Sequence, residues 1–176
     1  NALYSEANTI RKAYLKEFIC VHGIIEFSNI CAKDCCYCGL RSENGVKRYR
    51  MTVPEVVDTV LKAAERGYKL FVLQSGEDPY YSDELLEEMV RDIKRRSRVF
   101  IFLSIGERSY ESYKRLRKAG ASGVLLRFET SNPELFRGLH PEGKDLDNRL
   151  SHLRFLKELG YFIATGFMVG IPGQTI

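Results

Sequence analysis

Three cysteines are the residues of this chain whose type and spacing are best suited to chemistry. Cys31, Cys35 and Cys38 follow a C-x3-C-x2-C spacing directly after the apolar run 23–28. Thiolates are soft ligands that select iron–sulfur clusters, zinc or copper(I). Three thiolates on one short loop can hold three corners of a 4Fe–4S cube. The fourth iron then has no protein ligand, and a substrate or cofactor can bind there.

Other uses of these cysteines fit less well. A structural zinc site needs four ligands, and the side chain of the nearest spare thiol, Cys36, should diverge from that of adjacent Cys35. Cys20 and His22 lie upstream, and the chain has no second C-x-x-C pair. A disulfide framework is disfavoured because the cysteine count, 5, is odd and most of them are crowded together. We therefore predict a cluster, with zinc or unligated thiols as the alternatives.

The elements that must position this loop alternate between strand and helix. Strands are expected at residues 23–28, 70–73, 99–103, 124–126 and 162–169. Continuous apolar strands separated by helices indicate a parallel sheet with right-handed crossovers. An open doubly wound sheet competes with a (β/α) barrel, but no G-x-G-x-x-G turn follows the first strand, and polar residues gather at strand ends, as in a barrel. We expect one domain, residues 1–176, forming part of a TIM-type barrel with about five parallel strands.

Helix boundaries are marked by specific residues. Thr52 and Glu55 form a capping box, Ser82 caps the next helix, Gly120 ends another, and Pro133 stands in the first turn after Asn132. At the N-terminus, apolar residues recur at helical spacing and predict an amphipathic helix that packs on another part of the protein. These residues are Leu3, Ala7, Ile10, Tyr14 and Phe18.

Composition narrows the class of protein. A chain of 176 residues with 44% hydrophobic content can bury one core, and its net charge of +4 is modest. No apolar run approaches the length of about 18 residues that a membrane span needs, and no aromatic–basic interleaving indicates a nucleic-acid partner. Clustered thiols fit a reducing cytoplasm. The chain lacks an initiator Met and ends in a turn, so we expect a piece of a longer protein.

Polar residues follow the second and third predicted strands. Gln74, Gly76 and Glu77 end the second. A glycine beside a carboxylate lets backbone approach a ligand while the acid meets a cation, although a capped turn gives the same pattern. Ser104 ends the third strand, where its hydroxyl either bonds a ligand or closes the turn.

Arginines and a glutamate follow the fourth strand. Arg127 and Glu129 are two apart and point to the same side, so they either form an internal ion pair or bind ligands. Arg149 opens the next helix, and its guanidinium suits a carboxylate unless it is a surface residue.

The cysteine pattern, with aromatic Tyr37 just before Cys38, resembles the signature of radical S-adenosylmethionine (SAM) enzymes. The resemblance implies a barrel, a 4Fe–4S cluster, SAM bound at the open iron, and reductive cleavage of SAM to a 5′-deoxyadenosyl radical. Gly76 and Glu77 resemble the motif that holds the SAM amino group in that superfamily. Gly170 and Ile171 resemble its late glycine–isoleucine motif, which packs against adenine.

Longer strings resemble the HydE family, maturases of iron–iron hydrogenases that are related to biotin synthase and methylornithine synthase. The strings are residues 26–29, 38–41, 47–52, 73–81 and 168–175. The resemblance implies that Glu129 and Arg149 hold SAM, and that Gln74 and Arg127 line an anion site for a small iron–cysteine carbonyl/cyanide precursor. It also implies an electron donor for the cluster, and a second cluster beyond Ile176 in some members.

Three points stay open at this stage. Phe128 stands where the HydE family is expected to have histidine, which puts the local hydrogen bonding in question. A biotin synthase-like or methylornithine synthase-like enzyme is the alternative activity. A non-catalytic iron–sulfur or zinc-binding protein is the alternative of a different class, and it predicts no affinity for SAM.

Overall fold

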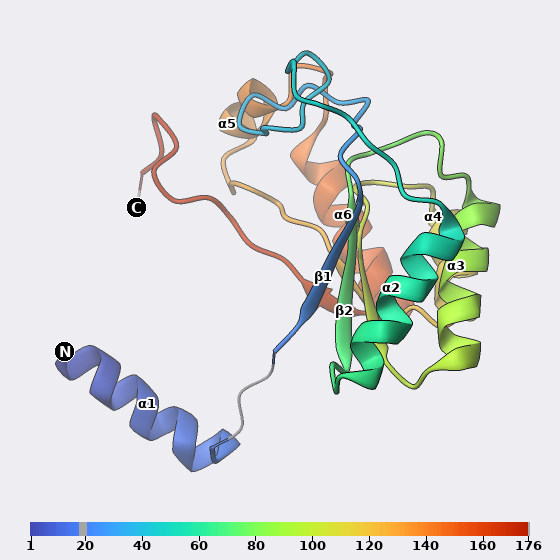
Figure 1. The fold of residues 1–176 in the computed structure, drawn as a ribbon. Helices are drawn as coiled ribbons and strands as arrows, with labels where there is room; N and C mark the ends of the chain where they lie inside the picture. Colours follow the sequence, from blue (N-terminus) through green and yellow to red (C-terminus); the bar gives the residue numbers. More distant parts are fainter. Residues whose placement is uncertain (18–20, 176) are drawn as a thin grey trace.

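Five parallel strands form one sheet with the strand order β1-β2-β3-β4-β5 (Figure 1). The structure is a computed structural model that describes residues 1–17 and 21–175; Phe18, Cys20 and Ile176 lie outside the described residues. The strands are β1 (Gly23–Ser28), β2 (Leu70–Ser75), β3 (Phe100–Ser104), β4 (Gly123–Leu125) and β5 (Phe162–Ala164). The helices are α1 (Ala2–Leu15), α2 (Val53–Glu65), α3 (Asp83–Arg96), α4 (Tyr110–Ala119), α5 (Pro133–Leu139) and α6 (Leu146–Glu158).

One row of apolar side chains crosses the whole sheet. The register pairs Ile25 with Leu73, Leu73 with Leu103, Leu103 with Val124 and Val124 with Ile163. The first four of these side chains are buried, together with the apolar faces of α2, α3 and α4. The sequential strand order and the crossover helices are those of a (β/α) barrel, as the sequence predicts, and the five strands form an open part of one.

The predicted helix signals are confirmed. Thr52 and Glu55 form the capping box of α2, and the Ser82 hydroxyl accepts a hydrogen bond from Leu85 N at the start of α3. Asn132 caps α5, and Gly120 ends α4 in the left-handed conformation, with φ 115°. Among the described residues, no helix combines the length and apolar content that crossing a bilayer requires.

Two predictions about the ends of the chain need correction. β5 ends at Ala164 instead of continuing to Val169. Beyond it an isolated bridge joins Phe167 to Glu129, because the segment after β4 leaves the extended conformation at Glu129, whose φ is 63°. The N-terminal helix forms, but α1 buries none of its residues and lies apart from the sheet (Figure 1). An amphipathic pattern specifies which face a helix can bury and leaves its partner undefined.

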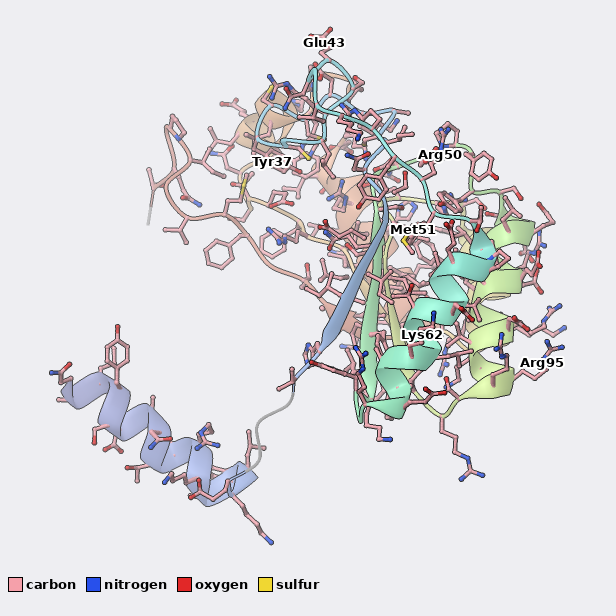
Figure 2. All side chains as sticks on the ribbon, viewed as in Figure 1. Tyr37, Glu43, Arg50, Met51, Lys62 and Arg95 are labelled. Atoms are coloured by element: carbon pink, nitrogen blue, oxygen red, sulfur yellow. The ribbon has the colours of Figure 1, made fainter. Side chains whose placement is uncertain are left out.

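The carboxyl ends of the strands all lie at one end of the sheet, and the cysteine loop lies there with α5 beside it (Figure 1). Figure 2 shows Tyr37 in this region and Arg95 near the opposite end of the helical layer. Side chains that follow the strands are therefore brought together with the thiols.

Candidate cluster and cofactor site

The cysteine loop is held against the end of β2. Glu77 N and Lys33 N each donate to Cys31 Sγ at 3.4 Å, and Leu40 N donates to Cys38 Sγ at 3.4 Å. Ala32 N donates to Glu77 O at 3.0 Å. Amide donors of this kind stabilise thiolate charge and tune an iron–sulfur cluster.

The three thiols that are predicted to bind a cluster lie on one loop. All four described cysteines are free thiols, and within residues 1–17 and 21–175 no three His, Cys, Asp or Glu side chains are close enough to hold one metal ion. The ligands of a zinc ion all contact the same atom, whereas the ligands of a cube contact different irons and lie further apart. The described residues therefore supply no four-ligand zinc site, and three thiols on one loop are a donor set that a cluster takes.

Cys36 points away from the other thiols, as expected from its position beside Cys35. Its thiol donates to Gly138 O at 3.6 Å and its amide donates to Leu139 O at 3.0 Å. Both acceptors belong to α5, so Cys36 attaches the loop to that helix. Burial raises the pKa of the Cys35 thiol to about 11, and Glu142 adds to this effect.

Arg48 organises the same loop from the other side. Its guanidinium donates four hydrogen bonds to main-chain carbonyls of Asn29 (2.6 Å), Leu40 (2.9 Å), Arg41 (2.6 Å) and Asn44 (2.9 Å). Only arginine presents a planar fork with enough donors for this arrangement.

Gly76 is required by the cysteine loop, and its predicted contact with a ligand stays a prediction. A Cβ at this position would lie 2.7 Å from Cys31 Cβ and would also collide with the carbonyl oxygen of Ile30. Gly106 has a parallel role one strand on: its φ is 73°, and a Cβ there would collide with the side chain of Glu77. The two glycines let the loop and the Glu77 carboxylate reach their places.

Three other charged side chains lie near the Glu77 carboxylate. Lys144 Nζ is 2.6 Å from Glu77 Oε1 and 3.5 Å from Glu107 Oε2. Glu107 also forms an ion pair with Arg149. Burial alone would raise the pKa of Glu107, but Arg149 and Lys144 outweigh it and hold the pKa below its usual range.

Arg149 is a buried residue, so the alternative of a surface arginine is excluded. It is 5% exposed, its guanidinium donates to the Arg127 carbonyl oxygen, and it lies over the Phe136 ring at 5.5 Å. These contacts fix the guanidinium at the mouth of the sheet.

Glu129 combines strain, burial and an unpaired oxygen. Its φ is 63°, a conformation that costs a non-glycine residue about 1–3 kcal/mol. The residue is 6% exposed, and its Oε2 is buried without a hydrogen-bond partner among the described atoms. Burial raises the pKa of this carboxyl, opposed by Arg127 and Arg149. A strained, buried carboxylate with an orphaned oxygen is suited to accept a donor from a ligand.

Tyr37 links Glu129 to His140. The Tyr37 hydroxyl lies 3.4 Å from Glu129 Oε1 and 3.2 Å from His140 Nε2. His140 Nδ1 lies 2.7 Å from the Phe136 carbonyl, so Nδ1 carries a proton. Burial lowers the pKa of His140, and Nε2 of the neutral ring competes with Glu129 Oε1 for the single proton of the Tyr37 hydroxyl. Burial raises the pKa of Tyr37 above its ordinary value, so this residue stays a donor.

The remaining predicted residues have contacts elsewhere than with the thiols. Gln74 donates to Glu26 Oε1 on β1 at 2.8 Å and is in register with Ser104. Arg127 is exposed, and no ion pair between its side chain and Glu129 occurs in the described part of the chain, so that alternative is not supported. Gly170 N and Ile171 N donate to Gln174 Oε1 in a separate turn.

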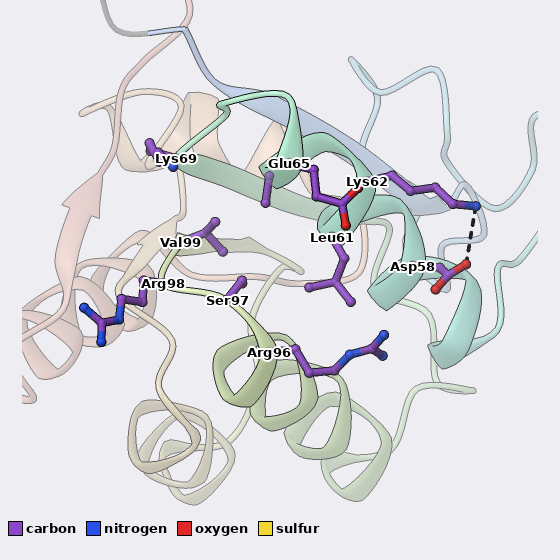
Figure 3. Close-up of a pocket in the computed structure, with 10 residues that line it drawn as sticks. Asp58, Leu61, Lys62, Glu65, Lys69, Arg96, Ser97, Arg98 and Val99 are labelled. Atoms are coloured by element: carbon purple, nitrogen blue, oxygen red, sulfur yellow. Dashed lines mark ion pairs between the residues drawn. The ribbon is translucent and has the colours of Figure 1, made fainter.

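A cavity of about 290 Å³ opens beside Glu77 and Glu107. It is lined by Ala32, Lys33, Glu77, Asp78, Pro79, Ile105, Glu107, Arg108, Ser109 and Ser112. A larger cavity of about 570 Å³ lies at the opposite end of β2 and β3, between the ends of α2 and α3, where Lys62, Lys69, Arg96 and Arg98 surround it (Figure 3). It contains none of the predicted ligands.

Sequence reasoning missed Lys144, His140 and Arg48, and it overlooked Glu107 as a site residue. One signal pointed to Glu107: β2 and β3 are each followed by a Gly-Glu pair, at residues 76–77 and 106–107. The other three gave no local signal, because their partners are distant carbonyls, carboxylates and a hydroxyl.

The site therefore offers three thiols, of which Cys31 and Cys38 accept amide hydrogen bonds, a carboxylate that holds an ammonium group, a buried guanidinium and an orphaned carboxylate oxygen. This donor set fits a cluster with an amino acid-bearing cofactor beside it. The sequence profile of the radical SAM superfamily matches residues 25–176, and the chain belongs to that superfamily. Its members use a 4Fe–4S cluster and SAM.

Within the superfamily, the chain is similar to a hydrogenase maturase. It is 48% identical over 176 residues to the [FeFe] hydrogenase maturase subunit HydE of Thermotoga maritima, covering 99% of this chain and 50% of that protein. It is 31% identical over 171 residues to 3-methylornithine synthase of Methanosarcina barkeri, covering 96% and 49%.

Solved structures agree with this relationship. The methylornithine synthase PylB superposes with a TM-score of 0.88 at 31% identity, covering 96% of this chain and 50% of that one. The [FeFe]-hydrogenase maturase HydG of Carboxydothermus hydrogenoformans gives a TM-score of 0.81 at 28% identity, covering 94% and 40%. The chain spans about half the length of the curated relatives that it matches.

Proposed function

We propose that this chain carries the cluster- and SAM-binding part of a radical SAM enzyme that acts in assembly of the iron–iron hydrogenase active site. The observation that carries the proposal is the 48% identity to HydE across 176 residues. The site geometry supports it, because the thiols, carboxylates and guanidinium that such an enzyme needs lie together at one end of the sheet.

Each part of the cofactor has a proposed partner in this site. Cys31, Cys35 and Cys38 hold three irons of the cluster. Glu77 receives the amino group of SAM and Arg149 its carboxylate, since a carboxylate and a guanidinium fork match those charges. When bound, the cluster and SAM supply a one-electron reductive cleavage that starts radical chemistry on a small substrate.

The other predicted residues act on the adenosine part of SAM in this proposal. Glu129 accepts a hydrogen bond at its orphaned oxygen, with Tyr37 beside it. Ser104, Gly170 and Ile171 complete the binding surface at the strand ends.

Arg127 and Gln74 are assigned to the substrate. Arg127 is exposed at the mouth of the sheet, where it can receive an anion such as an iron–cysteine carbonyl/cyanide precursor. Glu26 accepts a hydrogen bond from one amide proton of Gln74. The second amide proton is then available to the substrate. An electron donor for the cluster and a cytoplasmic location belong to the same proposal.

The test uses the full-length protein with a reconstituted, reduced cluster. Formation of 5′-deoxyadenosine from SAM is expected, and addition of the protein to a hydrogenase maturation mixture that lacks HydE should restore hydrogenase activity. SAM cleavage without restored maturation would contradict the maturase assignment while leaving the radical SAM assignment in place.

A second candidate follows from the likeness to PylB, whose fold superposes with a TM-score of 0.88. The same preparation should then form 3-methylornithine. Detection of that product by mass spectrometry, without restored maturation, would decide for this alternative.

A further inference from the structure

The two groups assigned to the amino acid part of SAM are each paired with a side chain of the protein. Glu77 Oε1 is 2.6 Å from Lys144 Nζ, and Arg149 forms an ion pair with Glu107. All four side chains are largely buried, with 10% of Lys144, 20% of Glu77, 14% of Glu107 and 6% of Arg149 exposed. They carry two positive and two negative charges, so the group of four side chains has no net charge.

Lys144 and Glu107 present the charged groups of an α-amino acid. An ammonium contacts the Glu77 carboxylate and a carboxylate contacts the Arg149 guanidinium, which is the pairing assigned above to the amino and carboxylate groups of SAM. The structure therefore shows directly that an ammonium fits beside Glu77.

We propose that Lys144 and Glu107 are specificity-determining residues that stand in for the amino acid head group of SAM and are displaced by it. The proposal rests on the roles proposed above for Glu77 and Arg149. When SAM binds, its ammonium replaces Lys144 on Glu77 and its carboxylate replaces Glu107 on Arg149. Lys144 and Glu107 then pair with each other.

The geometry already provides for this exchange. Lys144 Nζ lies 3.5 Å from Glu107 Oε2, so the new pair forms by a small movement of one flexible side chain. The three ion pairs of the free site are replaced by three in the bound one, and no buried charge is left without a partner, which would be costly. Lys144 also lies in the connection between α5 and α6, next to Gly143, whose φ is 76°.

The exchange makes recognition of the two head groups interdependent. A ligand with only an amino group releases Lys144 while Arg149 still holds Glu107, and a ligand with neither group releases nothing. A side chain that occupies the binding site also weakens the apparent affinity for the ligand, because only the fraction of molecules in which that side chain has moved away can bind. Removing the partner should therefore strengthen binding of ligands that carry the amino acid head group and leave others unchanged.

The experiment compares two adenosine thioethers on the full-length protein with an oxidised, reconstituted cluster. S-adenosylhomocysteine carries the amino acid head group and 5′-methylthioadenosine lacks it. Dissociation constants are measured by anaerobic calorimetry for the parent, Lys144→Met, Glu107→Gln, Glu77→Gln and the exposed control Lys157→Met. Iron content is determined for every variant before titration.

Lys144→Met is expected to bind S-adenosylhomocysteine about three- to tenfold more tightly than the parent, with 5′-methylthioadenosine unchanged. Glu107→Gln, a second variant that disturbs a different element, should show the same selectivity. Weaker or unchanged binding of S-adenosylhomocysteine, or equal changes for both ligands, would overturn the proposal. Glu77→Gln tests the underlying assignment: if it weakens S-adenosylhomocysteine while Lys144→Met does not strengthen it, only the displacement is wrong. If Glu77→Gln binds like the parent, the assignment of Glu77 and the displacement both fall.

Discussion

Arg50 and Asp78 form a two-point ion pair that closes the segment carrying the cysteines. Arg50 Nε lies 2.8 Å from Asp78 Oδ2 and Arg50 Nη2 lies 2.9 Å from Asp78 Oδ1. Ser28 Oγ donates to the same carboxylate at 2.6 Å. Ser28 and Arg50 themselves form an isolated antiparallel bridge. Both ends of the loop, at the end of β1 and before α2, are therefore fixed to one buried acid that follows β2.

This acid should control stability at low pH. Burial would raise the pKa of Asp78, but hydrogen bonds from Arg50 and Ser28 outweigh it and lower the pKa below 3.8. The folded protein thus gains stability that is present above that value and is lost as pH falls through the lowered pKa. Asp78→Asn should lower the melting temperature at pH 7 by about 3–8 °C, and the difference from the parent should shrink below about pH 4.

The control for Asp78→Asn is Asp58→Asn, which removes an exposed ion pair with Lys62. Exposed pairs contribute little, so its melting temperature should match that of the parent. Equal shifts in the two variants, or a difference that persists to pH 2, would contradict the role given to Asp78.

Arg48→Lys should loosen the cysteine loop without unfolding the sheet. An ammonium cannot reach four carbonyls placed around a planar fork. We expect about tenfold faster proteolytic cleavage within residues 39–47 and lower iron content after anaerobic reconstitution. Arg66→Lys, at an exposed position after α2, is the matched control. Cleavage at the parental rate would show that the four hydrogen bonds do not hold the loop.

The cysteine assignment makes a selective prediction. Replacement of Cys31, Cys35 or Cys38 by Ala should abolish binding of the cluster, about four irons per chain. Cys36→Ala should retain it, because that thiol contacts the Gly138 carbonyl, and Cys20→Ala should also retain it. Iron and sulfide analysis of the reconstituted variants decides the matter. An essential Cys36 with a dispensable Cys38 would reverse the assignment.

Arg149→Ala should weaken SAM binding about ten- to a hundredfold, which is the loss of one buried charge-assisted contact. The cluster should be retained, since Arg149 is no thiolate ligand. Equilibrium binding of SAM and the iron content of the same sample measure the two effects separately. A variant that binds SAM like the parent would remove Arg149 from the cofactor site.

Arg127→Ala should distinguish the binding of SAM from the binding of substrate. Because its side chain is exposed and no ion pair holds it in the described part of the chain, its loss should leave SAM binding and SAM cleavage in the absence of substrate near parental values. Turnover of the physiological substrate should fall. Time courses of 5′-deoxyadenosine with and without substrate give both quantities. Loss of SAM binding in Arg127→Ala together with normal binding in Arg149→Ala would show that the two roles are exchanged.

The alternation of strands and helices could be predicted because its signals are local. Ser82, Asn132 and the Thr52–Glu55 pair act within one helical turn, and the apolar runs define β1 to β4 closely. β5 was overextended because apolar residues continue past Ala164 while the hydrogen-bonding ladder does not. The free-standing position of α1 has no counterpart in its sequence pattern.

The site was predictable only in part, for a related reason. Thiols and carboxylates at strand ends can be recognised from residue type and position alone, so Cys31, Glu77 and Glu129 could be selected. The contacts of Lys144, His140 and Arg48 are made across 67, 103 and up to 19 residues respectively. No spacing rule links such positions before the sheet has brought them together.

The attachment of the cysteine loop to α5 sets an order of events during synthesis of the chain. Cys36 and its acceptor Gly138 are 102 residues apart, and Asp34 and Glu142 are 108 apart. Strands leave the ribosome in the order in which they pair, so β1 to β4 can assemble on the growing chain. The cysteine loop and its partner Glu77, which follows β2, can therefore fold before α5 has left the ribosome, and the contacts of Cys36 and Asp34 with residues 138 and 142 form later.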